Sequence, residues 1–83
     1  MKKFLYFSAP WCGPCKQLGP IMEELNEEGY TVQKIDVDSN PEIIQAFGIK
    51  NVPTVIIQVD DVEKGRKIGL GSKPMYLEMY NQA

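Results

Sequence analysis

The 83-residue sequence predicts a small α/β fold in which helices cover both faces of a four-stranded mixed β-sheet. Three observations support this prediction. Two β-prone runs, residues 3–8 and 31–37, flank a stretch with helical periodicity, which is the pattern of a β-α-β unit. Two further β-prone runs, 54–59 and 66–70, are separated only by the charged segment 60–65. Two more helical stretches, one before and one after this pair, complete the order β-α-β-α-β-β-α.

The N-terminal part of the chain predicts a strand followed by a helix. Residues 3–8 are apolar and aromatic, as in a buried strand, and the breaker residues 10–14 interrupt that run. In residues 15–28 the apolar side chains recur at helical spacing and the glutamates face solvent: Leu18, Ile21, Met22 and Leu25 against Glu23, Glu24, Glu27 and Glu28. We expect Gly29 to end this helix and Pro20 to kink it, because proline lacks a backbone N–H.

The remaining elements follow from caps and turn residues. Asn40 and Pro41 are suited to begin a short helix over residues 42–47, which ends at Gly48. Pro74 opens a last helix, whose expected core-facing side chains are Met75, Tyr76, Met79 and Tyr80. Because β-α-β crossovers are right-handed, the first two strands should be parallel, and the hairpin supplies antiparallel strands.

Size, charge and composition exclude several classes of function. Residues 1–83 leave room for a single domain, without a linker or an internal repeat. The net charge is −2 and the lysines are scattered, so no basic surface for nucleic acid is predicted. No apolar run approaches the ~18 residues of a membrane span. The apolar run after Met1-Lys2-Lys3 is too short for a signal peptide, so we expect a cytoplasmic protein. Histidine is absent, which excludes Ser-His-Asp triads and the usual zinc sites.

Cys12 and Cys15 lie where the first strand gives way to the first helix. The N–H groups and dipole of a helix N-terminus stabilise an anion, so we expect Cys12, at the exposed rim, to have a pKa below the ~8.5 of a free thiol. Cys15, one turn into the helix, is placed to attack a mixed disulfide formed at Cys12. Gly13 lets a partner backbone approach closely, and Pro14 stiffens the turn. The pattern predicts a redox-active pair that needs no bound cofactor.

Two alternatives would give the cysteine pair a purely structural role. A stapling disulfide would add little stability, because closing so short a loop hardly constrains the unfolded chain. A tetrahedral metal site would lack ligands within one chain, which has two cysteines and no histidine. The sequence therefore favours redox chemistry, and no metal site is predicted.

The string Trp11-Cys12-Gly13-Pro14-Cys15-Lys16 matches the active-site string of the thioredoxin family, and the chain resembles that family from Phe4 to about Tyr80. Four further matches are the helix-kinking Pro20, Lys34 beneath the active site, Gly69 of the substrate-binding rim, and Asn51-Val52-Pro53-Thr54, which resembles the segment that holds the cis-proline of the family. The resemblance implies a thioredoxin-like three-layer fold and thiol–disulfide oxidoreductase activity.

The sequence departs from ordinary thioredoxins in two respects. Their extra strand and helix before the dithiol strand are missing, so the layout is similar to that of glutaredoxins and of very short thioredoxin-like proteins of archaea and phages. Tyr6 stands where the family has a buried aspartate that helps to deprotonate the second cysteine, and Ser8 replaces a tryptophan of the family. The resemblance therefore leaves open how the proton leaves Cys15.

The residues around the dithiol have roles implied by the resemblance. Trp11 is expected to contact substrate, the alternative being a half-buried aromatic at the strand end. Pro53 is expected to be cis, although most X–Pro bonds are trans. With Val52 and Thr54 it would line a groove in which an extended substrate pairs as an added strand. Lys34 would either tune the thiolate or lie solvated on its strand.

Three functions fit these features. The first is a protein-disulfide reductase recharged by an NADPH-dependent thioredoxin reductase, which Trp11 and Gly13-Pro14 favour. The second is a glutaredoxin recharged by glutathione, for which Lys16, Lys50 and Gly69-Leu70-Gly71 are candidate contacts. The third is a thioredoxin-fold binding subunit without required catalysis. We expect the first function, with disulfide-containing proteins as substrates and a monomeric chain.

Overall fold

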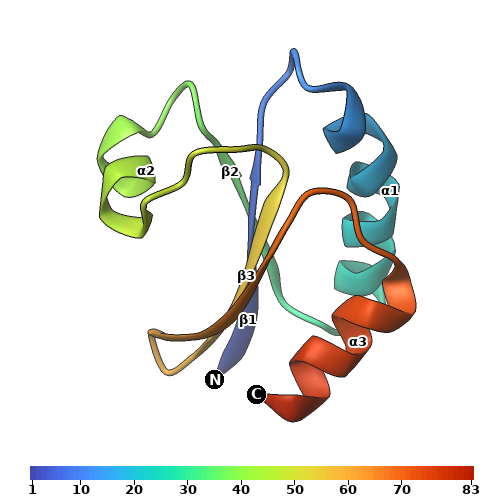
Figure 1. The fold of residues 1–83 in the computed structure, drawn as a ribbon. Coiled ribbons are helices and arrows are strands. Elements are labelled where there is room, and N and C mark those ends of the chain that lie inside the picture. The colour runs from blue at the N-terminus through green and yellow to red at the C-terminus, as the bar shows by residue number, and fades with distance from the viewer.

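One β-sheet lies between helices in the computed structural model, which describes residues 1–83 (Figure 1). The elements follow one another as β1 (Lys2–Ser8), α1 (Gly13–Glu27), β2 (Val32–Asp36), α2 (Pro41–Phe47), β3 (Thr54–Val59), β4 (Val62–Ile68) and α3 (Lys73–Gln82). Helices α1 and α3 pack on one face of the sheet, and α2 packs on the other. The predicted order and the helices on both faces are confirmed.

The sheet has the strand order β2-β1-β3-β4. Strands β1 and β2 are parallel, with Tyr6 opposite Lys34 and Ser8 opposite Asp36. Strand β3 runs antiparallel to both β1 and β4. The predicted mixed sheet is confirmed, because the crossover through α1 returns the chain beside β1 in the same direction. The edges of the sheet are β2 and β4, and the ladder between β3 and β4 shifts register near Ile57.

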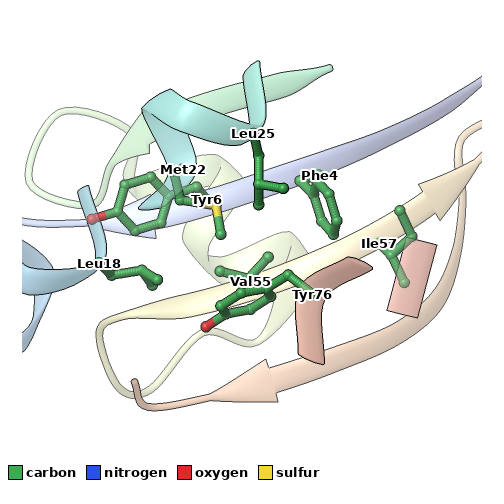
Figure 2. Packing of buried hydrophobic residues seen from close by; sticks show 8 residues of the cluster. All are labelled: Phe4, Tyr6, Leu18, Met22, Leu25, Val55, Ile57 and Tyr76. Atoms are coloured by element: carbon green, nitrogen blue, oxygen red, sulfur yellow. The ribbon is translucent and has the colours of Figure 1, made fainter. Parts of the chain in front are cut away.

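Alternating side chains of β1 and β3 divide the core between the two faces of the sheet. The larger cluster packs against α1 and α3 and contains Phe4, Tyr6, Leu18, Met22, Leu25, Val55, Ile57 and Tyr76 (Figure 2). The smaller cluster lies under α2 and contains Leu5, Phe7, Ile35 and Ile56. The apolar stripe predicted for the first helix therefore faces the core.

Helix α1 begins two residues earlier than predicted, at Gly13. The reason is that Cys12 takes the N-cap position, where its Sγ accepts a hydrogen bond from the backbone N–H of Cys15 at 3.2 Å. Pro14 fits the first turn because its missing N–H would have no partner there. Pro20 lies inside the helix, as the sequence predicts.

Glycines in the left-handed region follow the ends of α1 and α2. Gly29 has a φ of +99° and Gly48 has a φ of +64°, values that side chains disfavour. Helix α2 begins at Pro41, one residue earlier than predicted. Asn40 occupies its N-cap position without a capping hydrogen bond, and its Nδ2 instead donates to the carbonyl oxygen of Asp36 at 2.8 Å.

The fourth strand corrects the sequence-based prediction. Patterning predicts it over residues 66–70, after a connection of residues 60–65, whereas β4 already begins at Val62. The turn needs only Asp60 and Asp61, whose φ angles of +51° and +68° allow a tight two-residue link. Charged side chains suit an edge strand, so the charged run that indicates a loop in the sequence is compatible with β-structure.

Helix α3 begins at Lys73, one residue before the predicted start at Pro74. Ser72 caps the helix, because its hydroxyl accepts the backbone N–H of Met75 at 3.4 Å. Tyr76 is buried, and the other three predicted core positions pack partly buried against the larger cluster. The last helix thus faces the core as predicted.

The two termini lie together at one end of the molecule, and residues 9–13 lie at the other end (Figure 1). The Lys2 ammonium donates to the carbonyl oxygen of Tyr80 at 2.9 Å, which joins the first strand to the last helix. No helix has the length and apolar character that a membrane crossing requires.

Candidate active site

The two cysteines lie beyond the carboxyl end of β1, at the start of α1. Cys12 and Cys15 form a disulfide with their Cα atoms 5.3 Å apart. The N–H of Cys12 donates to the carbonyl oxygen of Ala9 at 3.1 Å, which turns the chain from the strand into the helix. Because Cys12 is the N-cap, its sulfur lies where a helix favours negative charge.

Burial does not distinguish the two cysteines. Cys12 is 4% exposed and Cys15 is 5% exposed, so the expectation that Cys12 lies at an exposed rim is wrong for the disulfide form. The cause is local packing, because the disulfide and Ala9 form a small cluster against which Val37 and Val52 pack. The surroundings of the two sulfurs differ more than their exposure.

Trp11 borders the disulfide and is held in place. Trp11 is 67% exposed, which contradicts the half-buried alternative. The indole Nε1 donates to Oδ2 of Asp38 at 2.9 Å. A groove of about 390 Å³ lies between this indole and the loop before β3, with Val52 and Ile49 among its apolar walls. The ring is therefore both fixed and accessible to a partner.

The loop before β3 closes the other side of the site. The peptide bond between Val52 and Pro53 is cis, and Pro53 is buried. The Pro53 carbonyl accepts the N–H of Gly69 at 2.8 Å, and Oγ1 of Thr54 donates to the carbonyl oxygen of Asn51 at 2.7 Å. Val52 packs against the cysteines, and its backbone N–H and C=O make no hydrogen bond within the protein. A free donor and a free acceptor thus lie beside the disulfide.

A cavity of about 310 Å³ reaches the disulfide from beneath, between α1 and the β1–β2 pair. Cys15 lines it together with polar side chains of the two strands, which are Tyr6, Ser8, Lys34 and Asp36. The Tyr6 hydroxyl, at the Leu18 end of the core cluster in Figure 2, donates to the carbonyl oxygen of Cys15 at 2.9 Å. Burial raises the pKa of Tyr6 above its usual value, so this phenol stays neutral and serves as a donor.

Two aspartates of this region are not among the sequence-predicted site residues. Asp36 lines the cavity with Cys15, and Asp38 holds the indole of Trp11. Asp36 lies two residues after Lys34, a spacing that puts both side chains on one face of a strand. This spacing is the sequence feature that could have identified Asp36 as a site residue. No local pattern connects Asp38 with an indole 27 residues away. Lys34 lines the cavity but is exposed, so both of its predicted alternatives stay open.

The candidate contacts for glutathione are not brought together. Lys16 lines the cavity beneath Cys15, whereas Lys50 lines the groove beside Trp11. The segment 69–71 lines neither of these two spaces. A tripeptide with two carboxylates and an amine would need such groups around one pocket.

The chain is similar to known proteins over almost its whole length. The family model described as Thioredoxin matches residues 2–79. A thioredoxin of Rickettsia felis is 39% identical over 80 residues, which cover 93% of this chain and 76% of that protein. A thioredoxin of Bacillus subtilis is 37% identical over 79 residues, covering 92% and 76%. The solved structure of a mutant thioredoxin from Halobacterium salinarum shares 33% identity at a TM-score of 0.92, covering 98% of this chain and 73% of that one.

Proposed function

Because the chain belongs to the thioredoxin family and is a thiol–disulfide oxidoreductase, we propose that it reduces protein disulfides and is recharged by an NADPH-dependent thioredoxin reductase. In this proposal Cys12 attacks the substrate and Cys15 resolves the mixed disulfide. The supporting observation is the Cys12–Cys15 disulfide at the N-terminus of α1, beside the loop that contains Pro53.

The first step is attack by Cys12 on a substrate disulfide. Its sulfur accepts the N–H of Cys15 at 3.2 Å, and a negative sulfur at this N-cap is stabilised by the helix dipole. The Cys12 thiolate forms a bond to one substrate sulfur, and the substrate S–S bond breaks. One substrate cysteine leaves as a thiolate, and the other remains joined to Cys12.

The second step is attack by Cys15 on the Cys12 sulfur. The Cys15 thiol loses its proton, the Cys12–Cys15 bond forms, and the bond between Cys12 and the substrate breaks. The second substrate sulfur leaves as a thiolate and takes up a proton. Two electrons have then passed from the dithiol to the substrate disulfide.

Substrate docking is supported by the unpaired backbone of Val52. An extended substrate segment that pairs with this N–H and C=O would be added beside the disulfide as a short strand. Gly13 leaves room above Cys12, since no atom from outside its chain neighbours and its own helix backbone lies within 4 Å of the position that a Cβ would take there. Trp11 and Gly69 would border the docked segment on either side, with the indole held by Asp38.

A protein reductant fits the site better than glutathione does. The surface above Cys12 is small and apolar because it is formed by Gly13 and Pro14, which suits docking of a protein. Lys16 and Lys50 lie in two different hollows, so no single pocket offers both charges to a tripeptide. This distribution supports the thioredoxin reductase over the glutaredoxin alternative.

The test compares two recharging systems with insulin as the disulfide substrate. We expect turnover with NADPH and the thioredoxin reductase of the organism of origin or its host, because docking is partner-specific. Turnover that is faster with NADPH, glutathione and glutathione reductase would instead establish a glutaredoxin. No turnover above background in either system, or with dithiothreitol, would favour a binding subunit.

The proposed compartment is the cytoplasm, where thiol pools keep a dithiol of this kind reduced between cycles. Cell fractionation combined with rapid thiol alkylation should recover the protein there in its reduced form. Recovery of an oxidised pool outside the cytoplasm would contradict this part of the proposal.

A further inference from the structure

The cavity beneath Cys15 combines polar groups from two neighbouring strands. Tyr6 pairs with Lys34 and Ser8 pairs with Asp36 in the parallel ladder, and side chains two residues apart on a strand share a face. All four side chains therefore line one space together with Cys15 from α1. A volume of about 310 Å³ accommodates several water molecules, since each needs roughly 30 Å³.

Only one residue lining this cavity carries a carboxylate. The Tyr6 phenol is neutral and already donates to the Cys15 carbonyl oxygen, and Lys34 and Lys16 carry ammonium groups, which have no acceptor site. The Ser8 hydroxyl is a far weaker base than a carboxylate. Asp36 is thus the one lining residue that offers a carboxylate as a proton acceptor.

The Asp36 carboxylate is held but not saturated. Its Oδ1 accepts the backbone N–H of Asp38 at 2.9 Å, and its Oδ2 accepts the Ser39 hydroxyl at 3.5 Å. A carboxylate has about four acceptor positions, so two remain for water. The turn after β2 fixes this group at the cavity wall, and its half-buried position keeps it in contact with solvent.

We propose that Asp36 accepts the proton of the Cys15 thiol, through water in this cavity, when Cys15 resolves the mixed disulfide. The inference rests on the proposed roles of the two cysteines. As the Cys15–Cys12 bond forms and the bond from Cys12 to the substrate breaks, the thiol proton passes to the Asp36 carboxylate. The departing substrate thiolate then takes a proton from solvent, and Asp36 returns its own proton to solvent.

The need for a local proton acceptor follows from burial. Cys15 is 5% exposed before any partner docks, and a substrate seated over Cys12 covers the outer surface further. Cys15 lines the cavity, but Trp11 and Val52, which border the proposed substrate site, do not, so we expect a docked substrate to leave the cavity open. Water in the cavity connects the buried thiol to a base without crossing the substrate interface.

Electrostatics alone predicts the opposite effect of removing Asp36. A carboxylate near Cys15 repels the thiolate, while Lys34 and Lys16 attract it. Asp38, at the end of the same turn, is engaged by the Trp11 indole. If Asp36 acted only through its charge, Asp36→Asn would favour the Cys15 thiolate and speed resolution. If Asp36 accepts the proton, the same change slows resolution.

The experiment measures the two thiol-exchange steps separately with 5,5′-dithiobis(2-nitrobenzoate). Attack by Cys12 on this disulfide releases one coloured thiolate, and resolution by Cys15 releases the second. In stopped-flow traces near neutral pH, we expect Asp36→Asn to slow the second release about tenfold or more and to change its pH profile. The first release should change less than about twofold, since Cys12 does not lose its proton to Asp36.

Glu23→Gln is the matched control. Glu23 lies by a neighbouring hollow that shares Tyr6, Gly19 and Lys34 but does not include Cys15. This variant removes the same charge and should leave both releases unchanged. In Asp36→Asn, the asparagine can still accept the Asp38 N–H. In Asp36→Ala, added formate should restore the second release in proportion to the formate concentration.

Three results would overturn the inference: an unchanged or faster second release in Asp36→Asn, equal slowing by Glu23→Gln, or no rescue of Asp36→Ala by formate. Failure of the proposed cysteine roles is seen separately in Cys15→Ser. That variant should stop after one release, and a second release from it would show that the roles, rather than Asp36, are assigned wrongly.

Discussion

At the scale of single residues, the two sulfurs of the disulfide have different surroundings. The sulfur of Cys12 accepts a backbone N–H at the start of α1, whereas Cys15 borders a polar cavity with Tyr6 and Asp36. A helix start stabilises an anion, and a polar cavity allows a proton to be exchanged. This difference supports attack by Cys12 and resolution by Cys15, although both residues are equally buried.

The assignment predicts opposite behaviour of two variants toward a protein disulfide such as that of insulin. Cys15→Ser should accumulate a mixed disulfide through Cys12, because no thiol remains to resolve it. Cys12→Ser should trap little, since the remaining thiol lacks the N-cap position. Non-reducing electrophoresis and mass spectrometry identify the trapped residue. Substrate trapped mainly by Cys12→Ser would reverse the roles.

The residue scale also shows which parts of the site the sequence can reveal. The dithiol is a local string, so its position, its chemistry and the helix after it are visible without a structure. Asp36 and Asp38 become site residues only through pairing of β2 with β1 and through the turn that follows. Tyr6 is recognisable in sequence only as a departure from a family pattern, and its bond to the Cys15 carbonyl requires the fold.

At the scale of elements, helices are easier to predict here than the last strand. Glycines and prolines mark the helix ends, and helical spacing marks the buried face. Strand β4 lacks alternating apolar positions, because it lies at an edge and carries Glu63, Lys64, Arg66 and Lys67. The start of β4 depends on the positive φ angles of Asp60 and Asp61. Aspartate tolerates this conformation, but an aspartate in the sequence does not predict it.

The segment between β4 and α3 is packed against the core, which gives Gly71 a specific role. Its N–H donates to the Tyr76 hydroxyl at 3.1 Å, and a Cβ at this position would lie 2.8 Å from that hydroxyl and in contact with Met75. Tyr76 is fully buried and cannot move aside easily. We expect Gly71→Ala to lower the free energy of unfolding by about 1–3 kcal/mol.

Urea denaturation checks this expectation, with Gly65→Ala as the control. A Cβ at Gly65 would meet Ile57 at 3.6 Å, an ordinary contact, and alanine is the better strand residue. The control should leave the free energy of unfolding unchanged or raise it. Equal stability of Gly71→Ala and the unmodified chain would mean that Tyr76 moves freely, against its packing in the cluster.

At the scale of the whole molecule, one sheet carries both parts of the core. Ile57 faces the cluster under α1 and α3, and its neighbour Ile56 faces the cluster under α2. Because β1 and β3 contribute to both clusters, we expect both faces to unfold together as one domain. Ile56→Val and Ile57→Val should each lower the free energy of unfolding of the whole chain by about 0.5–1.5 kcal/mol.

The measurement is urea unfolding followed both by circular dichroism and by hydrogen exchange of amides on each face. Both variants should keep a single transition, and the two probes should coincide. Separate transitions in Ile56→Val would show instead that the α2 face unfolds on its own. Crossover handedness predicts the parallel pair of β1 and β2, and the hairpin predicts the antiparallel pair of β3 and β4. The pairing of β1 with β3, which joins these two halves into one sheet, comes only from the structure, as does the start of β4.

The edges of the sheet bear on how the protein behaves in a crowded solution. Strand β2 is short, with five residues, and β4 combines a register shift with four charged side chains among its seven residues. Short, irregular and charged edges resist pairing with other strands. A redox carrier meets many partly oxidised proteins, and some of these expose unpaired strands of their own. We therefore expect edges of this kind to disfavour strand pairing with such partners and the mixed aggregates that would follow from it.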